Sequence, residues 1–189
     1  KRGIFVAKKG NLQGAKKKYA LIDENGKLKI AGFETVRKDW SLIARETQEK
    51  VLEMILKEGN CENALNYVKD IIMMVRNKKI ENKKMVILTQ LKMDIDSYQQ
   101  IGPHVAVAKR LRREGFEVRA GSLISYVIKE GKGMIRDKAG VPGECAAGCY
   151  DSGYYVDNQV IPAVEKIFEV FHVDIAKEIE GEQKSLGEF

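Results

Sequence analysis

Residues 27–60, KLKIAGFETVRKDWSLIARETQEKVLEMILKEGN, change from a strand pattern to a helix pattern within one stretch. Lys27 to Ala31 are predicted to form the return strand of a hairpin whose turn is the Asn25-Gly26 pair. From Asp39 the period is helical, with Asp39 as the expected cap and Gly59 as the stop. The apolar stripe of this helix contains Ile43, Val51, Leu52, Ile55 and Leu56. An α+β fold is therefore expected.

The first strand of this hairpin is expected at Tyr19 to Asp23, and one more short strand is expected before it, at Ile4 to Ala7, with a loop between the two. Two or three strands alone bury too little apolar surface to fold independently. The N-terminal segment is therefore expected to form the edge of a sheet whose centre lies elsewhere.

A second helix is predicted to start at Asn60 and to pair with the first in antiparallel fashion. The stretch MVILTQ, residues 85–90, predicts a buried strand. The stretch GPHVAVAKRLRREG, residues 102–115, predicts a helix with Pro103 in its first turn.

The C-terminal part of the chain adds strands and one more helix. Residues 118–139 predict a strand, a glycine turn and another strand. The last helix is expected at residues 154–171, where Pro162 predicts a kink. An acidic tail follows.

The charged residues are unevenly distributed. The chain of 189 residues has 33 Lys and Arg against 27 Asp and Glu, a net charge of +6. The basic residues gather in several clusters, whereas acidic residues concentrate on helical faces and in the tail. Such clusters favour a polyanionic partner, and nucleic acid is the expected one. A surface rich in ion pairs is the alternative explanation of the charge.

No apolar run approaches the roughly 20 residues that a membrane-spanning helix needs, and the N-terminus lacks a signal-peptide pattern. A cytoplasmic location is therefore expected. The three cysteines are Cys61, Cys145 and Cys149. Because their number is odd and no histidine lies at ligand spacing, we expect loop cysteines rather than a disulfide framework or a zinc site.

Asp94 and Asp96 lie one residue apart, just after a predicted strand. Two-metal nucleotidyl transfer uses paired carboxylates, so the pair is chemically admissible as a metal site. No third carboxylate follows on a neighbouring strand. Residues of a surface turn at a helix entry are therefore the favoured interpretation of the pair, and no residue of the chain is assigned to metal binding or catalysis.

Several stretches together resemble the C-terminal part of archaeal family B DNA polymerases. They occur in the same order and at similar spacing, and they are KKKYALID, GFETVRKDWSLIARETQEKVLEMILKEGN, GPHVAVAKRL, VRAGSLISYVI, GKGMIRDKA and YYVDNQVIPAVEKIF. In that family the region is the end of the palm followed by the thumb. The catalytic motifs of the family, of the Tyr-Gly-Asp-Thr-Asp and Ser-Leu-Tyr-Pro types, do not occur in this sequence.

The resemblance implies three parts of the chain: residues 1–37 as the C-terminal part of the palm, 38–175 as a mostly helical thumb with a small β subdomain, and 176–189 as an acidic tail. The short strands would complete a palm sheet. The chain is then expected to be the small subunit of a split, heterodimeric polymerase; a proteolytic or engineered fragment fits equally well. The large polypeptide, with exonuclease, fingers and catalytic palm, would bind the Mg²⁺ and perform nucleotidyl transfer. This chain alone is expected to bind no cofactor.

The resemblance also assigns residues that grip the primer-template duplex during DNA replication. Lys16, Lys17, Lys18 and Tyr19 match the family's Lys-Lys-Arg-Tyr motif, with Lys18 in place of the usual arginine. A solvated lysine run is the alternative. The remaining expected DNA contacts are Arg37, Lys38, Lys109, Arg110, Arg119, Ser122, Lys132, Arg136 and Lys138. His104 is interpreted either as a packing residue or as a phosphate contact.

The tail sequence QKSLGEF places Gln183, Leu186 and Phe189 at the spacing of the box that binds the sliding clamp (PCNA). Its position on an acidic tail resembles that in archaeal polymerases, and an ordinary tail is the alternative. Two other functions stay open. One is a nucleic-acid-binding module that works without a polymerase partner, and the other is a metal-dependent nuclease or transferase that uses Asp94 and Asp96.

Overall fold

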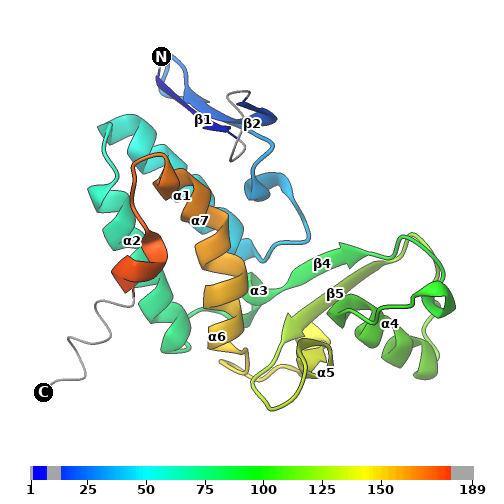
Figure 1. Ribbon diagram of the computed structural model, residues 1–189. Coiled ribbons are helices and arrows are strands. Elements are labelled where there is room, and N and C mark those ends of the chain that lie inside the picture. The colour runs from blue at the N-terminus through cyan, green and yellow to red at the C-terminus, as the bar shows by residue number, and fades with distance from the viewer. Residues whose placement is uncertain (1, 8–13, 180–189) are drawn as a thin grey trace, which may run out of the picture. The chain divides into compact units, whose positions relative to one another are not determined.

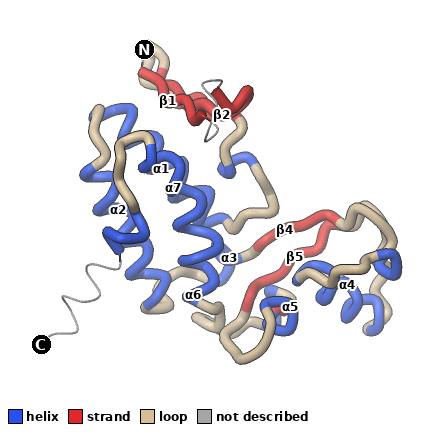
Figure 2. Tube along the Cα trace, viewed as in Figure 1, coloured by secondary structure: helices blue, strands red, loops and turns tan. Residues whose placement is uncertain are grey.

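The computed structural model describes residues 2–7 and 14–179 (Figure 1). The chain divides into two compact units. Unit 1 consists of Lys1–Arg37, Ala44–Met73 and Val156–Phe189, and unit 2 consists of Lys38–Ile43 and Met74–Tyr155. Helices and short antiparallel strands both contribute to the fold (Figure 2), which confirms the expected α+β class.

Unit 1 begins with a three-stranded antiparallel sheet in the order β1-β2-β3. The strands are β1 (Arg2–Ala7), β2 (Gly14–Ile22) and β3 (Leu28–Ala31). The turn between β2 and β3 is the predicted one, because Gly26 has a φ of 76° and Asp23 accepts hydrogen bonds from the backbone N–H groups of Asn25 and Lys27.

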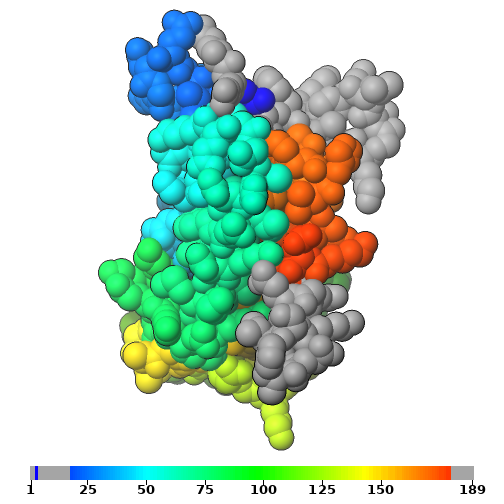
Figure 3. Space-filling model, turned by 90° about the vertical axis from the view of Figure 1, so that its left-hand side faces the viewer, coloured from blue at the N-terminus to red at the C-terminus, as the bar shows by residue number. Residues whose placement is uncertain are grey.

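The helices of unit 1 are α1 (Leu42–Glu58), α2 (Glu62–Arg76) and α7 (Ile161–Glu169), of which α1 and α2 each have a few residues in unit 2. Side chains from all three are buried, and they include Val51, Leu52, Ile55, Val68, Ile72, Val164 and Phe168. The orange residues of α7 lie directly beside the cyan and teal residues of α1 and α2 (Figure 3). The predicted apolar stripes therefore form one helical core.

The starting residue of α1 differs from the prediction. Asp39 was expected to cap the helix, but it lies in a turn, and the helix begins at Leu42. Ser41, which directly precedes the helix, is fully buried. The cap prediction was wrong because Asp39 lies three residues before the first residue of α1, so it is not at the capping position.

Unit 2 contains a second antiparallel sheet, in the order β4-β5-β6. Its strands are β4 (Ile87–Gln90), β5 (Leu123–Ile128) and the two-residue β6 (Ala139–Gly140). Helix α4 (Pro103–Arg113) starts at the proline as predicted, and the short helices are α3 (Asn82–Met85), α5 (Ile135–Lys138) and α6 (Ser152–Tyr155).

The expected second strand within residues 118–139 is mostly a helix. Residues Ile135–Lys138 form α5, where the Asp137 carboxylate accepts a hydrogen bond from the Met134 N–H at 3.3 Å. Only Ala139 and Gly140 pair with β5. The strand prediction failed because this side-chain contact to the backbone favours a helical turn in a segment with little apolar alternation.

Tyr155 joins three segments of unit 2. Its hydroxyl donates to the Met85 carbonyl at 2.6 Å and accepts from the Ile128 N–H at 3.1 Å, and its side chain is fully buried. Burial raises the pKa of the phenol, so it stays protonated and able to donate. A π-helical turn, Val156–Val160, follows α6. The irregularity that the predicted kink implied thus lies just before Pro162, which is the second residue of α7.

Candidate nucleic-acid interface

The net positive charge lies entirely in unit 2. Its residues include 16 Lys and Arg against 10 Asp and Glu, a net charge of +6, whereas unit 1 has 17 of each. The net charge of the whole chain is also +6. Unit 2 is therefore the part that would attract a polyanion through its net charge.

The predicted lysine motif lies on β2, in unit 1. Lys16 and Lys17 are residues of this strand, and Tyr19 is partly buried in it. The Lys18 ammonium lies 2.6 Å from a carboxylate oxygen of Glu34, and the side chain of Lys18 is 27% exposed. The side chain of Lys18 therefore has an intramolecular partner, which the sequence pattern did not indicate.

Arg37 and Lys38 are exposed neighbours at the first boundary between the two units. Arg37 ends the segment after the short 3-10 helix Glu34–Val36, whose Glu34 carbonyl accepts from the Arg37 N–H at 2.9 Å. The Lys38 carbonyl accepts from the Leu88 N–H at 3.1 Å and so ties its backbone to β4. The backbone of both residues is thus held in place while their side chains reach solvent.

The basic residues of α4 differ in their partners. Arg110 contacts Glu144 at 2.9 Å and Glu114 at 3.6 Å, so its charge is compensated within unit 2. Lys109 is partly buried on the same helix. Of these two predicted contacts, Lys109 is the better candidate for a phosphate, because no ion pair is seen for it among the residues that the structure describes.

The predicted DNA contacts that follow α4 in the sequence differ in how exposed they are. Arg119 and Lys132 are exposed, and the contact of Arg119 with Glu117 at 3.3 Å joins two side chains that are both about 80% exposed. Ser122 accepts a hydrogen bond from the Arg119 N–H at 3.1 Å, and Arg136 lies 3.8 Å from Asp137. Lys138 is only 15% exposed and forms an ion pair with Asp151, so it contributes to the packing of unit 2.

Asp94 and Asp96 form the surface turn that was predicted. The Asp94 carboxylate accepts from the Asp96 N–H at 3.1 Å at the start of the 3-10 turn Ile95–Ser97. Asp96 accepts two hydrogen bonds from the Arg112 guanidinium, at 2.7 and 3.0 Å, and these lower the pKa of its carboxyl. Within residues 2–7 and 14–179, no three side chains of the metal-ligating kinds come together. This aspartate pair does not fit a two-metal site, because Arg112 occupies both oxygens of one member.

His104 lies in the first turn of α4 with its ring edge-on to Tyr98, at 5.9 Å between centroids. Its pKa is lowered by burial and by the nearby Lys92 charge. A neutral imidazole at pH 7 suits the packing role better than a phosphate contact. The three residues of the expected clamp-binding box, Gln183, Leu186 and Phe189, lie outside the described residues.

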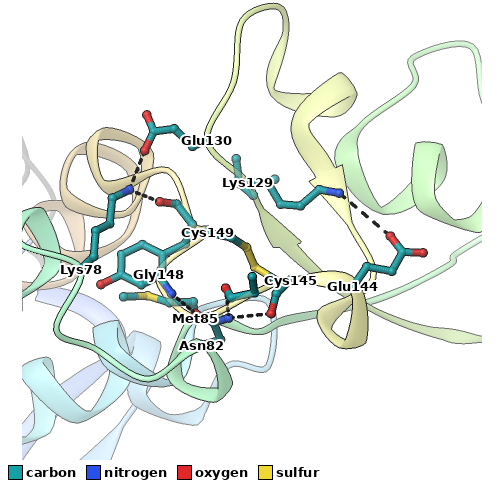
Figure 4. Close-up of a disulfide and its surroundings, with 12 residues drawn as sticks. Lys78, Asn82, Met85, Lys129, Glu130, Glu144, Cys145, Gly148 and Cys149 are labelled. Carbon is teal, nitrogen blue, oxygen red and sulfur yellow. Dashed lines mark hydrogen bonds and ion pairs between the residues drawn. A yellow bond between two sulfur atoms is a disulfide. The ribbon is translucent and has the colours of Figure 1, made fainter.

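Cys145 and Cys149 lie in a loop, as predicted, but the expectation that they would not form a disulfide was wrong. Cys145 and Cys149 form a disulfide (Figure 4). Cys61 is free. Asn82 holds the disulfide loop, since its amide N–H donates to the carbonyls of Cys145 and Ala146 and its oxygen accepts from the Gly148 N–H. The sequence signal that could have indicated the bond is the spacing of four residues with Gly148 between the cysteines, because a glycine permits the tight turn that the bond needs. In the structure Gly148 has a φ of 72°.

The described residues contain no helix with the combination of length and apolar character that a bilayer crossing requires. Comparison with known proteins places the chain more specifically. A family model described as DNA polymerase family B matches residues 10–171. A structure of the family B DNA polymerase from Pyrobaculum calidifontis superposes with a TM-score of 0.71 at 34% identity, covering 82% of this chain and 20% of that one.

Three curated relatives are each called DNA polymerase. The protein from Thermococcus aggregans is 46% identical over 172 residues, which are 90% of this chain and 9% of the relative. The one from Methanocaldococcus jannaschii is 43% identical over 192 residues, 100% of this chain and 11% of the relative, and the one from Thermococcus gorgonarius is 45% identical over 90% of this chain and 21% of the relative. The chain thus spans between about a tenth and a fifth of their length. With a match over most of its residues, the chain belongs to family B of the DNA polymerases.

Proposed function

We propose that the chain is the palm-end and thumb part of a DNA-directed DNA polymerase, and that it grips the primer-template duplex during replication. The observation that supports this most directly is the concentration of the whole net charge of +6 in unit 2 of a chain from this family. Cationic side chains that contact phosphates bind any sequence, as a replicative enzyme requires.

The nucleotidyl transfer itself is assigned to a separate large polypeptide with exonuclease, fingers and catalytic palm. In this proposal the chain is the small subunit of a split enzyme, and Mg²⁺ binds at the carboxylates of the large subunit. The structure of the aspartate pair supports the division, because the Arg112 guanidinium binds both carboxylate oxygens of Asp96, so that this pair does not offer a two-metal site. This chain would position the duplex, whereas the metal ions would activate the primer hydroxyl and neutralise the leaving group.

Primer extension tests the division of labour. The chain is assayed alone and then with the candidate large polypeptide from the same genome, and we expect synthesis only in the mixture. Synthesis by the chain alone would indicate that Asp94 and Asp96 are catalytic, and the Asp94→Asn variant should then be inactive. Duplex binding by the chain with no stimulation of any polymerase would instead favour the stand-alone nucleic-acid-binding module.

Charge reversal tests the grip. Arg37→Glu with Lys38→Glu is expected to weaken binding to a labelled primer-template duplex and to reduce the slope of log affinity against log salt by about 2. Lys27→Glu with Lys29→Glu is the matched control, because it makes the same charge change at two exposed lysines outside the proposed contacts. Equal effects of both pairs in a fluorescence anisotropy titration would contradict a localised interface.

Clamp binding is the remaining part of the proposal. Gln183, Leu186 and Phe189 are proposed to bind the sliding clamp, with the two apolar side chains in one pocket. Phe189→Ala is expected to abolish most of the affinity for the clamp in calorimetry. Unchanged affinity would leave the tail without this role.

A further inference from the structure

The third lysine of the β2 run is built into a polar network inside unit 1. The Lys18 ammonium contacts Glu34 at 2.6 Å, and the Glu34 side chain is only 11% exposed. The same ammonium lies 5.8 Å from the centre of the Phe33 ring, which is 1% exposed. The cation therefore lies against a carboxylate and an aromatic face, both contributed by the segment that follows β3.

Gln48 connects this ion pair to the helical core. It is fully buried on α1, and its amide N–H donates to the second Glu34 oxygen at 2.7 Å and also to the Ala163 carbonyl of α7. Its amide oxygen accepts from the Thr35 N–H at 2.9 Å. One side chain thus joins α1, α7 and the Glu34–Val36 turn, and Lys18 adds β2 to the group.

The electrostatics of Glu34 are consistent with a completed network. Burial raises the pKa of this carboxyl, but the hydrogen bonds from Lys18 and Gln48 more than offset that effect, so the pKa lies below its ordinary value. A buried carboxylate that lost its cation would be left with an uncompensated charge. Lys18 therefore has a structural reason to stay where it is.

We propose that Lys18 is a positioning residue: through Glu34 and Gln48 it anchors β2 to the helices of unit 1, and it does not bind a phosphate of the duplex. The inference rests on the proposed function only where it concerns DNA, since the anchoring is a property of the chain alone. It revises the assignment of Lys18, whereas Lys16 and Lys17 keep theirs.

A double-mutant cycle tests the anchor without DNA. Lys18→Met and Glu34→Gln are each expected to raise the equilibrium constant for unfolding by about 10-fold or more, because each leaves a polar group of the pair without its partner. The combined variant removes both charges. Its equilibrium constant for unfolding is expected to rise by clearly less than the product of the two single fold-changes. Lys18→Arg keeps the ion pair and is expected to retain most of the stability. Independent effects of the two substitutions would overturn the proposal.

Duplex titrations at several salt concentrations distinguish the two roles of Lys18. If Lys18 contacted a phosphate of the duplex and shared its charge with Glu34, the Glu34→Gln variant would bind DNA more tightly. The Lys18→Met variant would then lose one phosphate contact, and the slope of log affinity against log salt would fall by about 1. An anchor predicts an unchanged slope in both variants, with affinity equal to or weaker than that of the unmodified chain. Stronger binding in Glu34→Gln, or a reduced slope in Lys18→Met, would overturn the inference.

Lys17→Met on the same strand is the matched control, and its slope is expected to fall by about 1. An unchanged slope in Lys17→Met as well would contradict the proposed DNA contact of the strand. The anchor would then still be supported by the stability cycle, so the two failures are distinguishable.

Discussion

The two units treat charge in different ways. Unit 1 is neutral in sum and places charged and polar groups, Lys18, Glu34 and Gln48, in a network at the edge of its core. Unit 2 has the whole net charge of +6, although it too contains a largely buried ion pair, between Lys138 and Asp151. The two units therefore differ in net charge and not in whether they contain buried ion pairs, and only unit 2 has the excess of positive charge that would attract a polyanion.

Tyr155→Phe in unit 2 gives the largest expected effect, because buried hydrogen bonds are not confined to the neutral unit. The substitution leaves the Ile128 N–H and the Met85 carbonyl buried without their partner, at an expected cost of about 3 kcal/mol in the free energy of unfolding. Urea unfolding measures it. Tyr126→Phe is the control, since among the described residues the Tyr126 hydroxyl makes a single long contact, of 3.4 Å, with Thr89. A loss below 1 kcal/mol for Tyr155→Phe would mean that this hydroxyl does not join the three segments.

The disulfide gives the next largest effect and concerns unit 2 alone. Replacing Cys145 and Cys149 with Ser is expected to cost about 2 kcal/mol, as the loop closed by the bond is short. Reductant should destabilise the unmodified chain by a similar amount and leave the double variant unaffected. Thiol titration of the unfolded chain without reductant should find the single thiol of Cys61, and three thiols would contradict the bond.

Acid titration compares one ion pair from each unit and gives the smallest expected effect. The pKa of Glu34 in unit 1 and that of Asp151 in unit 2 are both lowered in the folded chain: burial alone raises each, and hydrogen bonds from Lys18 and Lys138 outweigh it. A lowered folded pKa means stability that is present above the unfolded value and lost as the pH falls below it. The loss should begin near pH 4.5 for Glu34 and near pH 3.8 for Asp151.

Glu34→Gln and Asp151→Asn separate these contributions. Each variant is less stable than the unmodified chain at pH 7, and the difference is expected to shrink as the pH falls through its window. Unfolding by urea at a series of pH values measures the two curves. A difference that stays constant down to pH 3 would show that the carboxylate charge contributes nothing at that position.

The sequence predicted those elements whose signal is local. The Asn25-Gly26 turn, the apolar stripe of α1 and the proline at the start of α4 each depend on neighbouring residues, and the structure confirms all three. The surface position of Asp94 and Asp96 also followed from the local pattern of strand and turn.

The missing features depend on contacts between residues far apart in the chain. Gln48 meets Ala163 across 115 positions, and Lys78 meets both Glu130 and the Tyr150 carbonyl across more than 50. Figure 4 shows the Lys78 ammonium pointing toward the Glu130 carboxylate, near the disulfide loop. Periodicity cannot identify such pairs, because it reports which face of an element is apolar and not which polar group the fold will place against it.

The same limit applies to the expected DNA contacts. The family resemblance assigned Arg110 and Lys138 to DNA contacts together with Lys38 and Lys132, but only the fold shows that the first two have carboxylate partners. A basic residue whose charge is already paired with a carboxylate is therefore a weaker candidate for a DNA contact than one without such a partner.

The division of the chain into units has a practical consequence for anyone who shortens the gene. Unit 1 is assembled from three separate stretches and unit 2 from two, so the chain passes between them at four places. No single stop codon or new start codon yields either unit intact. A domain-deletion library of this polypeptide should therefore join non-adjacent stretches rather than trim from one end.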